Sequence, residues 1–81
     1  MKEQNKHYYR KLGIKIAYYR KQRDLTQQEV AFRMEIEPPN ISRIENGRTG
    51  LTLDKIIDVA EVLDVPLHLL FDFRDLLDDC E

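Results

Sequence analysis

The sequence predicts an all-α fold of five helices, and two observations support this prediction. Apolar residues recur every three or four positions through most of the 81 residues, which is the spacing of one buried helix face. Residues that favour helix ends, such as Thr26, Thr52 and Pro66, separate these periodic stretches. We expect a single small domain, in which the core is limited and helix packing or dimerisation adds stability.

The first helix is expected from Tyr8 to Arg23. Leu12 and Ile16 would face the core together with Tyr19. Three lysines of the stretch are expected in solvent: Lys11, Lys15 and Lys21. The preceding residues 1–7 are polar, so we expect a flexible tail there.

The second and third helices are expected between Thr26 and Gly47. Thr26 opens a capping box with Glu29, in which the hydroxyl accepts from the Glu29 amide and the carboxylate reaches back. The chain then turns after Ile36. Pro38 and Pro39 cannot lie inside a helix but can begin one, which ends at the favourable C-cap pair Asn46-Gly47.

A helical wheel of the third helix separates two faces. Ile41 and Ile44 fall together and are expected in the core. The opposite face is formed by Pro39, Ser42, Arg43 and Asn46, with Asn40 at its edge. This face carries hydrogen-bonding groups and no large apolar side chain, which suits the major groove of DNA.

The last part of the chain is predicted to hold two more helices and an acidic tail. Thr52 caps a helix that runs to Leu63, and Pro66 can start a final helix. The tail from Asp72 to Glu81 contains apolar residues at spacings of three and four, which are too many for a solvated segment. They either cover the chain's own core or meet a partner subunit, and we favour the partner.

Charge is distributed unevenly along the chain. Residues 1–50 hold 11 Lys and Arg against 6 Asp and Glu, whereas residues 51–81 hold 2 against 9. A basic half suits phosphate binding. No run of residues is long and apolar enough for a membrane span, and the N-terminus lacks the apolar core of a signal peptide. A single cysteine, Cys80, gives no disulfide or metal cluster, so we expect a cytoplasmic protein without cofactor or metal.

The stretch from Thr26 to Gly47 resembles the helix-turn-helix of the phage repressor/Cro-type (XRE) DNA-binding family. The similar residues are the Gln27-Gln28-Glu29 opening, the small Ala31, the apolar Val30, Met34, Ile36, Ile41 and Ile44, and the Ser-Arg-Ile-Glu-Asn-Gly run of residues 42–47. The similarity extends from about Leu12 to Phe71. It implies a five-helix repressor-like domain, here residues 8–73, followed by an acidic extension at 74–81 that is suited to dimerisation.

The chain departs from the usual family residues at two places, the turn and the start of the recognition helix. Glu35 stands at the turn where the family usually has glycine, and a positive φ at a residue with a side chain costs roughly 1–2 kcal/mol. Pro38 and Pro39 occupy the positions at the start of the recognition helix where the family usually has polar base-reading residues.

The resemblance also implies which side chains meet DNA. Base contacts are expected from Arg43, Asn40, Ser42 and Pro39, and phosphate contacts from Gln27, Gln28, Asn46 and Arg48. We expect Arg43 to read guanine through its O6 and N7 acceptors. The resemblance implies a structural ion pair between Arg20 and Glu45.

These features predict a small transcriptional regulator, a repressor, that reads double-stranded DNA with an inverted repeat through the helix of about residues 38–46. We expect a homodimer, with interface candidates Leu69, Leu70, Phe73, Leu76 and Leu77. The alternative is an antitoxin-like or adaptor module that binds a regulatory protein partner. An enzyme is disfavoured, because the two histidines lie far apart in sequence and no nucleophile or Gly-rich phosphate motif accompanies them.

Overall fold

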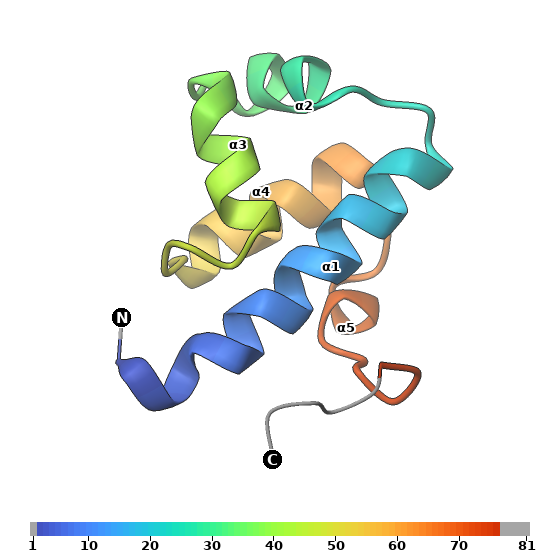
Figure 1. The fold of residues 1–81 in the computed structure, drawn as a ribbon. Helices are drawn as coiled ribbons and strands as arrows, with labels where there is room; N and C mark the ends of the chain where they lie inside the picture. Colours follow the sequence, from blue (N-terminus) through green and yellow to red (C-terminus); the bar gives the residue numbers. More distant parts are fainter. Residues whose placement is uncertain (1, 77–81) are drawn as a thin grey trace.

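The computed structural model describes residues 2–76, in which helices are joined by turns and loops and no strand occurs (Figure 1). Their bounds are η1 Glu3–Asn5, α1 Lys6–Gln22, α2 Gln27–Met34, α3 Pro38–Glu45, α4 Leu53–Leu63 and α5 Leu67–Leu70. The long helix α1 crosses the molecule diagonally, α2 and α3 lie on one side of it, and α5 lies on the other (Figure 1). The predicted all-α fold with five α-helices is confirmed.

The core lies where the five α-helices meet. Its buried side chains are Leu12, Ile16, Val30, Ala31, Ile41, Ile44, Ile56, Val59, Ala60, Leu63 and Leu70. The two isoleucines of α3 are among them, so the predicted inner face of that helix is correct. Tyr19 is half-buried and packs against this cluster. No helix of residues 2–76 is long and apolar enough to cross a membrane.

Two threonines cap helices as the sequence predicts. Thr26 Oγ1 accepts from the Glu29 amide at 3.0 Å, and the Thr26 amide donates to Glu29 Oε1 at 2.7 Å. Hydrogen bonding from Thr26 to the carboxylate, first of all from the Thr26 amide, lowers the pKa of the Glu29 carboxyl because it favours the charged form. Thr52 Oγ1 accepts from the Lys55 amide at 3.2 Å and starts α4.

The turn between α2 and α3 keeps a left-handed residue although that residue is not glycine. Glu35 has φ 59° and ψ 43°. The Ile36 amide then donates to Ala31 O at 3.0 Å, which satisfies a carbonyl at the end of α2. Strain of about 1–2 kcal/mol is therefore retained at Glu35 rather than removed by a different turn.

Two expectations for the first helix and the residues before it were wrong. The first helix was expected from Tyr8, but α1 begins at Lys6 and the short helix η1 precedes it. Lys15 was expected in solvent, but it is 7% exposed, and its Nζ lies 2.5 Å from Asp75 Oδ1. The segment after α5 folds back over α1 and supplies this partner, which α1 alone could not reveal. The hydrogen bond from Lys15 lowers the pKa of the Asp75 carboxyl.

The C-terminal segment partly covers the core of its own chain. Helix α5 ends at Leu70, and Leu70 is 0% exposed, so it is unavailable to a partner subunit. Phe73 is half-buried and packs against the same core. Leu69 and Leu76 are half-buried, whereas Leu77 lies outside the described residues.

Candidate nucleic-acid interface

Helix α3 presents a polar face to the outside. It is eight residues long, with two prolines in its first turn and Asn46 as its C-cap. Ile41 and Ile44 anchor its inner side, while Pro39, Arg43 and Asn46 are exposed. Figure 1 shows α3 at one edge of the molecule, joined to α2 by a short turn. We call the outward side of α3 the reading face.

Hydrogen bonds link the polar groups of the reading face in pairs. Arg43 Nη1 donates to Asn40 Oδ1 at 3.0 Å, and Asn46 Nδ2 donates to Ser42 Oγ at 3.4 Å. An arginine has five N–H donors, so this bond leaves Arg43 with donors to spare. The structure thus brings together Asn40, Ser42, Arg43 and Asn46 on one exposed surface.

A nearly buried carboxylate fixes α3 to α1 and α2. Arg20 Nε donates to Glu45 Oε2 at 2.6 Å, and Arg20 Nη2 donates to Glu45 Oε1 at 3.2 Å. The side chains of Arg20 and Glu45 are 12% and 6% exposed. Arg20 Nη1 also donates to Leu25 O at 2.8 Å, which ties in the loop before α2. One ion pair therefore fixes the C-terminal turn of α3.

Gln27 takes part in the same network. Its Nε2 donates to Glu45 Oε1 at 2.9 Å. This side chain, which is expected at a DNA phosphate, spans from the start of α2 to the end of α3. Gln28, the next residue, is exposed.

Two glycines allow α1 and the end of α3 to come into backbone contact. A Cβ on Gly13 would lie 2.6 Å from Ile44 O and also against Glu45 O. Gly47 has φ +68°, and a Cβ there would lie 2.6 Å from the Cα of Arg10. From the sequence, Gly47 was expected only as a helix end, and no role was expected for Gly13. A glycine inside a predicted helix was the available signal.

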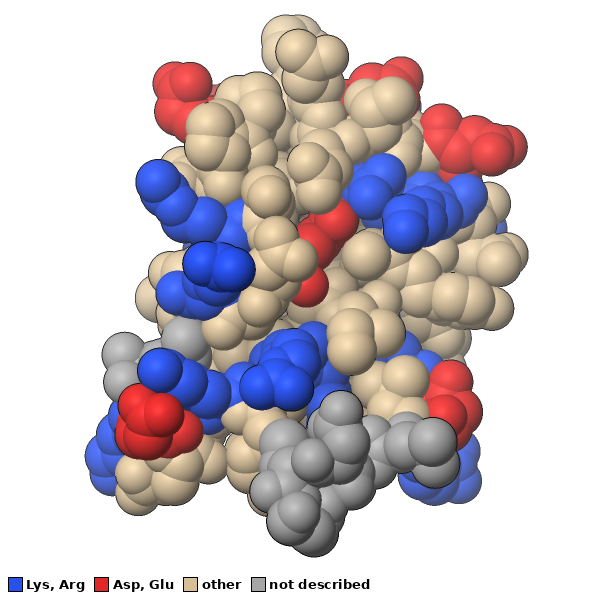
Figure 2. All heavy atoms as spheres, in the orientation of Figure 1, with Lys and Arg blue, Asp and Glu red and all other residues tan. Residues whose placement is uncertain are grey.

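Figure 2 shows Asp and Glu along the upper edge, at the centre and at both lower corners of the view. On and beside α2, Glu29, Glu35 and Glu37 are exposed. Lys and Arg gather below this edge, on the left beside the end of α3 and along α1 (Figure 2). The basic area therefore adjoins the C-terminal end of the reading face.

Comparison with known proteins agrees with this geometry. A family model described as helix-turn-helix, of the XRE type, matches residues 16–70. The chain belongs to this family. No curated protein matches the sequence. As an XRE-type helix-turn-helix protein, the chain is a DNA-binding regulator.

Two solved structures share the fold of this helix-turn-helix protein. The restriction-modification controller protein C.AhdI from Aeromonas hydrophila is 25% identical, with a TM-score of 0.74 over 78% of this chain and 96% of that chain. The DNA-binding domain of BldD is 22% identical, with a TM-score of 0.73 over 80% of this chain and 94% of that one.

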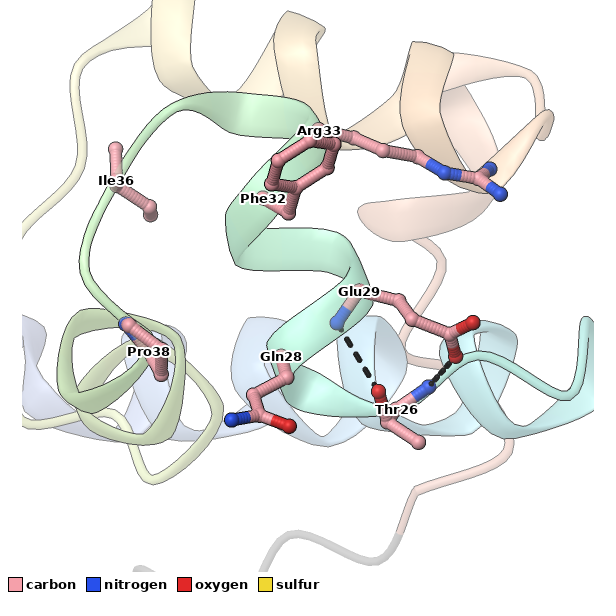
Figure 3. Close-up of a pocket in the computed structure, with 7 residues that line it drawn as sticks. All are labelled: Thr26, Gln28, Glu29, Phe32, Arg33, Ile36 and Pro38. Carbon is pink, nitrogen blue, oxygen red and sulfur yellow. Dashed lines mark hydrogen bonds between the residues drawn. The ribbon is translucent and has the colours of Figure 1, made fainter.

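This helix-turn-helix protein has a hollow beside the start of its recognition helix α3 (Figure 3). The lining residues are Thr26, Gln28, Glu29, Phe32, Arg33, Ile36 and Pro38. Phe32 is 84% exposed on the outer side of α2, with Ile36 and Pro38 on the other side of the hollow. No role was expected for Phe32 from the sequence, although its position outside the apolar stripe of α2 was a signal that its side chain is exposed.

Proposed function

We propose that this protein is a sequence-specific repressor that places α3 in the major groove of double-stranded DNA. The observation that carries the proposal is the reading face, which offers Asn40, Ser42 and Arg43 outward from a helix anchored by two isoleucines. Side chains of this kind bind base edges, and an arginine can bind guanine O6 and N7 together. Repression follows because the bound protein excludes other proteins from the same DNA.

Phosphate contacts would position the reading face on the duplex. Asn46, at the C-terminal end of the reading face, and Arg48, two residues later, are exposed. The first amides of α2, beside the exposed Gln28, form a helix N-terminus that can hold a phosphate. Gln27 contributes indirectly, because its bond to Glu45 holds α2 and α3 together. Such contacts set orientation and affinity, whereas base contacts set sequence preference.

We further propose that two copies bind together as a homodimer. A single recognition helix reads only a few base pairs, which gives too little specificity among the competing sites of a genome. The C-terminal third offers half-buried Leu69 and Leu76 together with Phe71, which is 44% exposed. Leu70 is excluded from this interface because it is fully buried in its own chain.

Selection of bound duplexes from a random library tests both proposals. We expect an inverted repeat whose half-sites lie about 10–10.5 base pairs apart, because a two-fold dimer places its recognition helices one DNA turn apart. Random duplex should also bind at low salt, with an affinity that falls as salt rises. Enrichment of one unrepeated site would contradict the dimer. Absence of any salt-sensitive binding would contradict the function.

Separate roles are expected for Arg43 and Arg48. Arg43→Ala should reduce discrimination between the selected and random duplexes by about 1–3 kcal/mol, the value of a good bidentate base contact. Arg48→Ala should weaken binding to both duplexes by the same factor, because a phosphate contact carries no sequence information. Dissociation constants of both variants on both duplexes measure this difference. An unchanged ratio for Arg43→Ala would place direct base reading elsewhere on the surface.

A second candidate function, binding a regulatory protein, is favoured by the hollow beside α3. Phe32 is 84% exposed and lines the hollow, and a contiguous exposed apolar patch commonly marks a contact surface. Ile36 and Pro38 extend its apolar character, while the nearby Glu35 and Glu37 carry charge of the same sign as DNA. This role is compatible with DNA binding, and it becomes the main one if selection returns no duplex.

A further inference from the structure

The N-terminal half of α1 precedes the segment that the family model matches, which starts at residue 16, yet it packs against the end of α3. We propose that Arg10, with Lys6 one turn earlier, contacts DNA phosphates and extends the DNA-binding surface beyond the recognition helix. This inference rests on the proposed function. We call Arg48, Arg10 and Lys6 the basic track.

Backbone packing places Arg10 beside the loop that follows α3. A Cβ on Gly47 would lie 2.6 Å from Arg10 Cα and 2.7 Å from Arg10 N, so only a glycine lets the two backbones approach this closely. The next residue after Gly47 is Arg48, whose amide donates to Arg43 O at 2.9 Å. Gly13, almost one turn after Arg10, makes the second close contact with α3. The position of Arg10 relative to the reading face is thereby fixed.

The side chains of the basic track are available to a ligand. Arg10 and Arg48 are exposed, and neither has an ion-pair partner within residues 2–76. Lys6 is paired only with Glu3, at 3.1 Å, and the two side chains are 53% and 84% exposed. Exposed pairs of this kind contribute little, so a phosphate can replace Glu3.

The track also has a spacing that suits a DNA strand. Residues four apart lie on the same side of a helix, about 6 Å apart along its axis. Lys6 and Arg10 therefore lie exposed on one side of α1, and the backbone of Arg10 contacts Gly47, the residue before Arg48. A polyanion that lies along α3 would meet these cations in succession. The contacts would be independent of sequence and would weaken with salt.

The test measures binding of the full chain to a random duplex and to a selected duplex over a range of salt concentrations. For Arg10→Ala we expect the slope of log K against log salt to lose about one unit of its magnitude. Binding to both duplexes should weaken by the same factor, about eightfold at 0.1 M salt, because one phosphate contact scales as salt to the power of about −0.9. Arg10→Lys should restore most of the slope, since it keeps the charge.

Arg74→Ala is the matched control, because it removes the same charge from an exposed arginine after α5 that pairs with Asp72. We expect its salt slope to equal that of the wild type. If Arg10→Ala leaves the slope unchanged while the wild type binds, the inference is wrong and the proposed function stands. If Arg74→Ala lowers the slope equally, only net charge matters and the inference also fails. If the wild type shows no salt-sensitive binding, the proposed function itself fails.

Discussion

Gly13→Ala is expected to lower the free energy of unfolding by roughly 1–3 kcal/mol, the usual cost of overpacking a well-packed site. The added Cβ would lie 2.6 Å from Ile44 O, and a backbone carbonyl cannot rotate away as a side chain can. Helix α1 and the end of α3 would have to separate. The sign of this change in the free energy of unfolding is informative. Ala in a helix interior is normally favoured over Gly by about 1 kcal/mol, so a loss of stability must come from the contact with α3.

Chemical denaturation followed by circular dichroism measures this loss. Gly50→Ala is a suitable control, because Gly50 is exposed and its φ is not positive. Its effect should stay within about 0.5 kcal/mol, as for other surface substitutions. A Gly13→Ala protein that is as stable as the wild type, or more stable, would show that α1 and α3 do not pack as closely as described.

Arg20→Ala is expected to destabilise the protein by about 3–5 kcal/mol, since removal of one partner from a buried ion pair leaves the other charge uncompensated. Glu45 is only 6% exposed, and without Arg20 its remaining side-chain donor is Gln27. The Leu25 carbonyl would lose its arginine donor as well. Glu45→Gln should destabilise the protein as well, because it leaves the Arg20 charge without its counter-ion.

The midpoint and slope of urea unfolding, compared between the wild type and Arg20→Ala, give the loss in the free energy of unfolding. Arg74→Ala breaks the exposed pair with Asp72, at 2.8 Å, and exposed pairs contribute about 0–1 kcal/mol. A loss for Arg20→Ala as small as the loss for Arg74→Ala would mean that the Arg20–Glu45 pair is not a main support of α3.

The local features of the fold could be predicted because neighbouring residues determine them. The capping box of Thr26 and Glu29 needs only a spacing of three, and the buried Ile41 and Ile44 follow from helical periodicity. The capping role of Thr52 is of the same kind.

Some features that join distant parts of the chain escaped prediction, whereas the Arg20–Glu45 pair was expected from the family resemblance. Lys15 and Asp75 are 60 positions apart, so the helical pattern of α1 gave no sign that Lys15 would be covered and paired. Gly13 is unfavourable for an isolated helix, and its use becomes clear only when the backbone of α3 lies against it. Leu70 appeared to be a spare apolar residue because a sequence does not show how large the core is.

Within the candidate site, residue type was more predictable than residue role. The outward positions of Pro39, Arg43 and Asn46 followed from the helical wheel. The phosphate contact expected from Gln27 stays a prediction, because its amide can donate to a phosphate as well as to a carboxylate. The nearby Glu45 provides the acceptor that it binds here.

The Glu45 network has a consequence for how a duplex would fit. Because one carboxylate accepts from both Arg20 and Gln27, the three helices α1, α2 and α3 are joined into a rigid unit. Such a unit cannot adjust the tilt of α3 to an imperfect groove, so the adjustment has to be made by the DNA. Bending or twisting the DNA costs energy that depends on the flexibility of its base-pair steps. Base pairs between the half-sites, which no side chain touches, would then influence affinity through their stiffness alone.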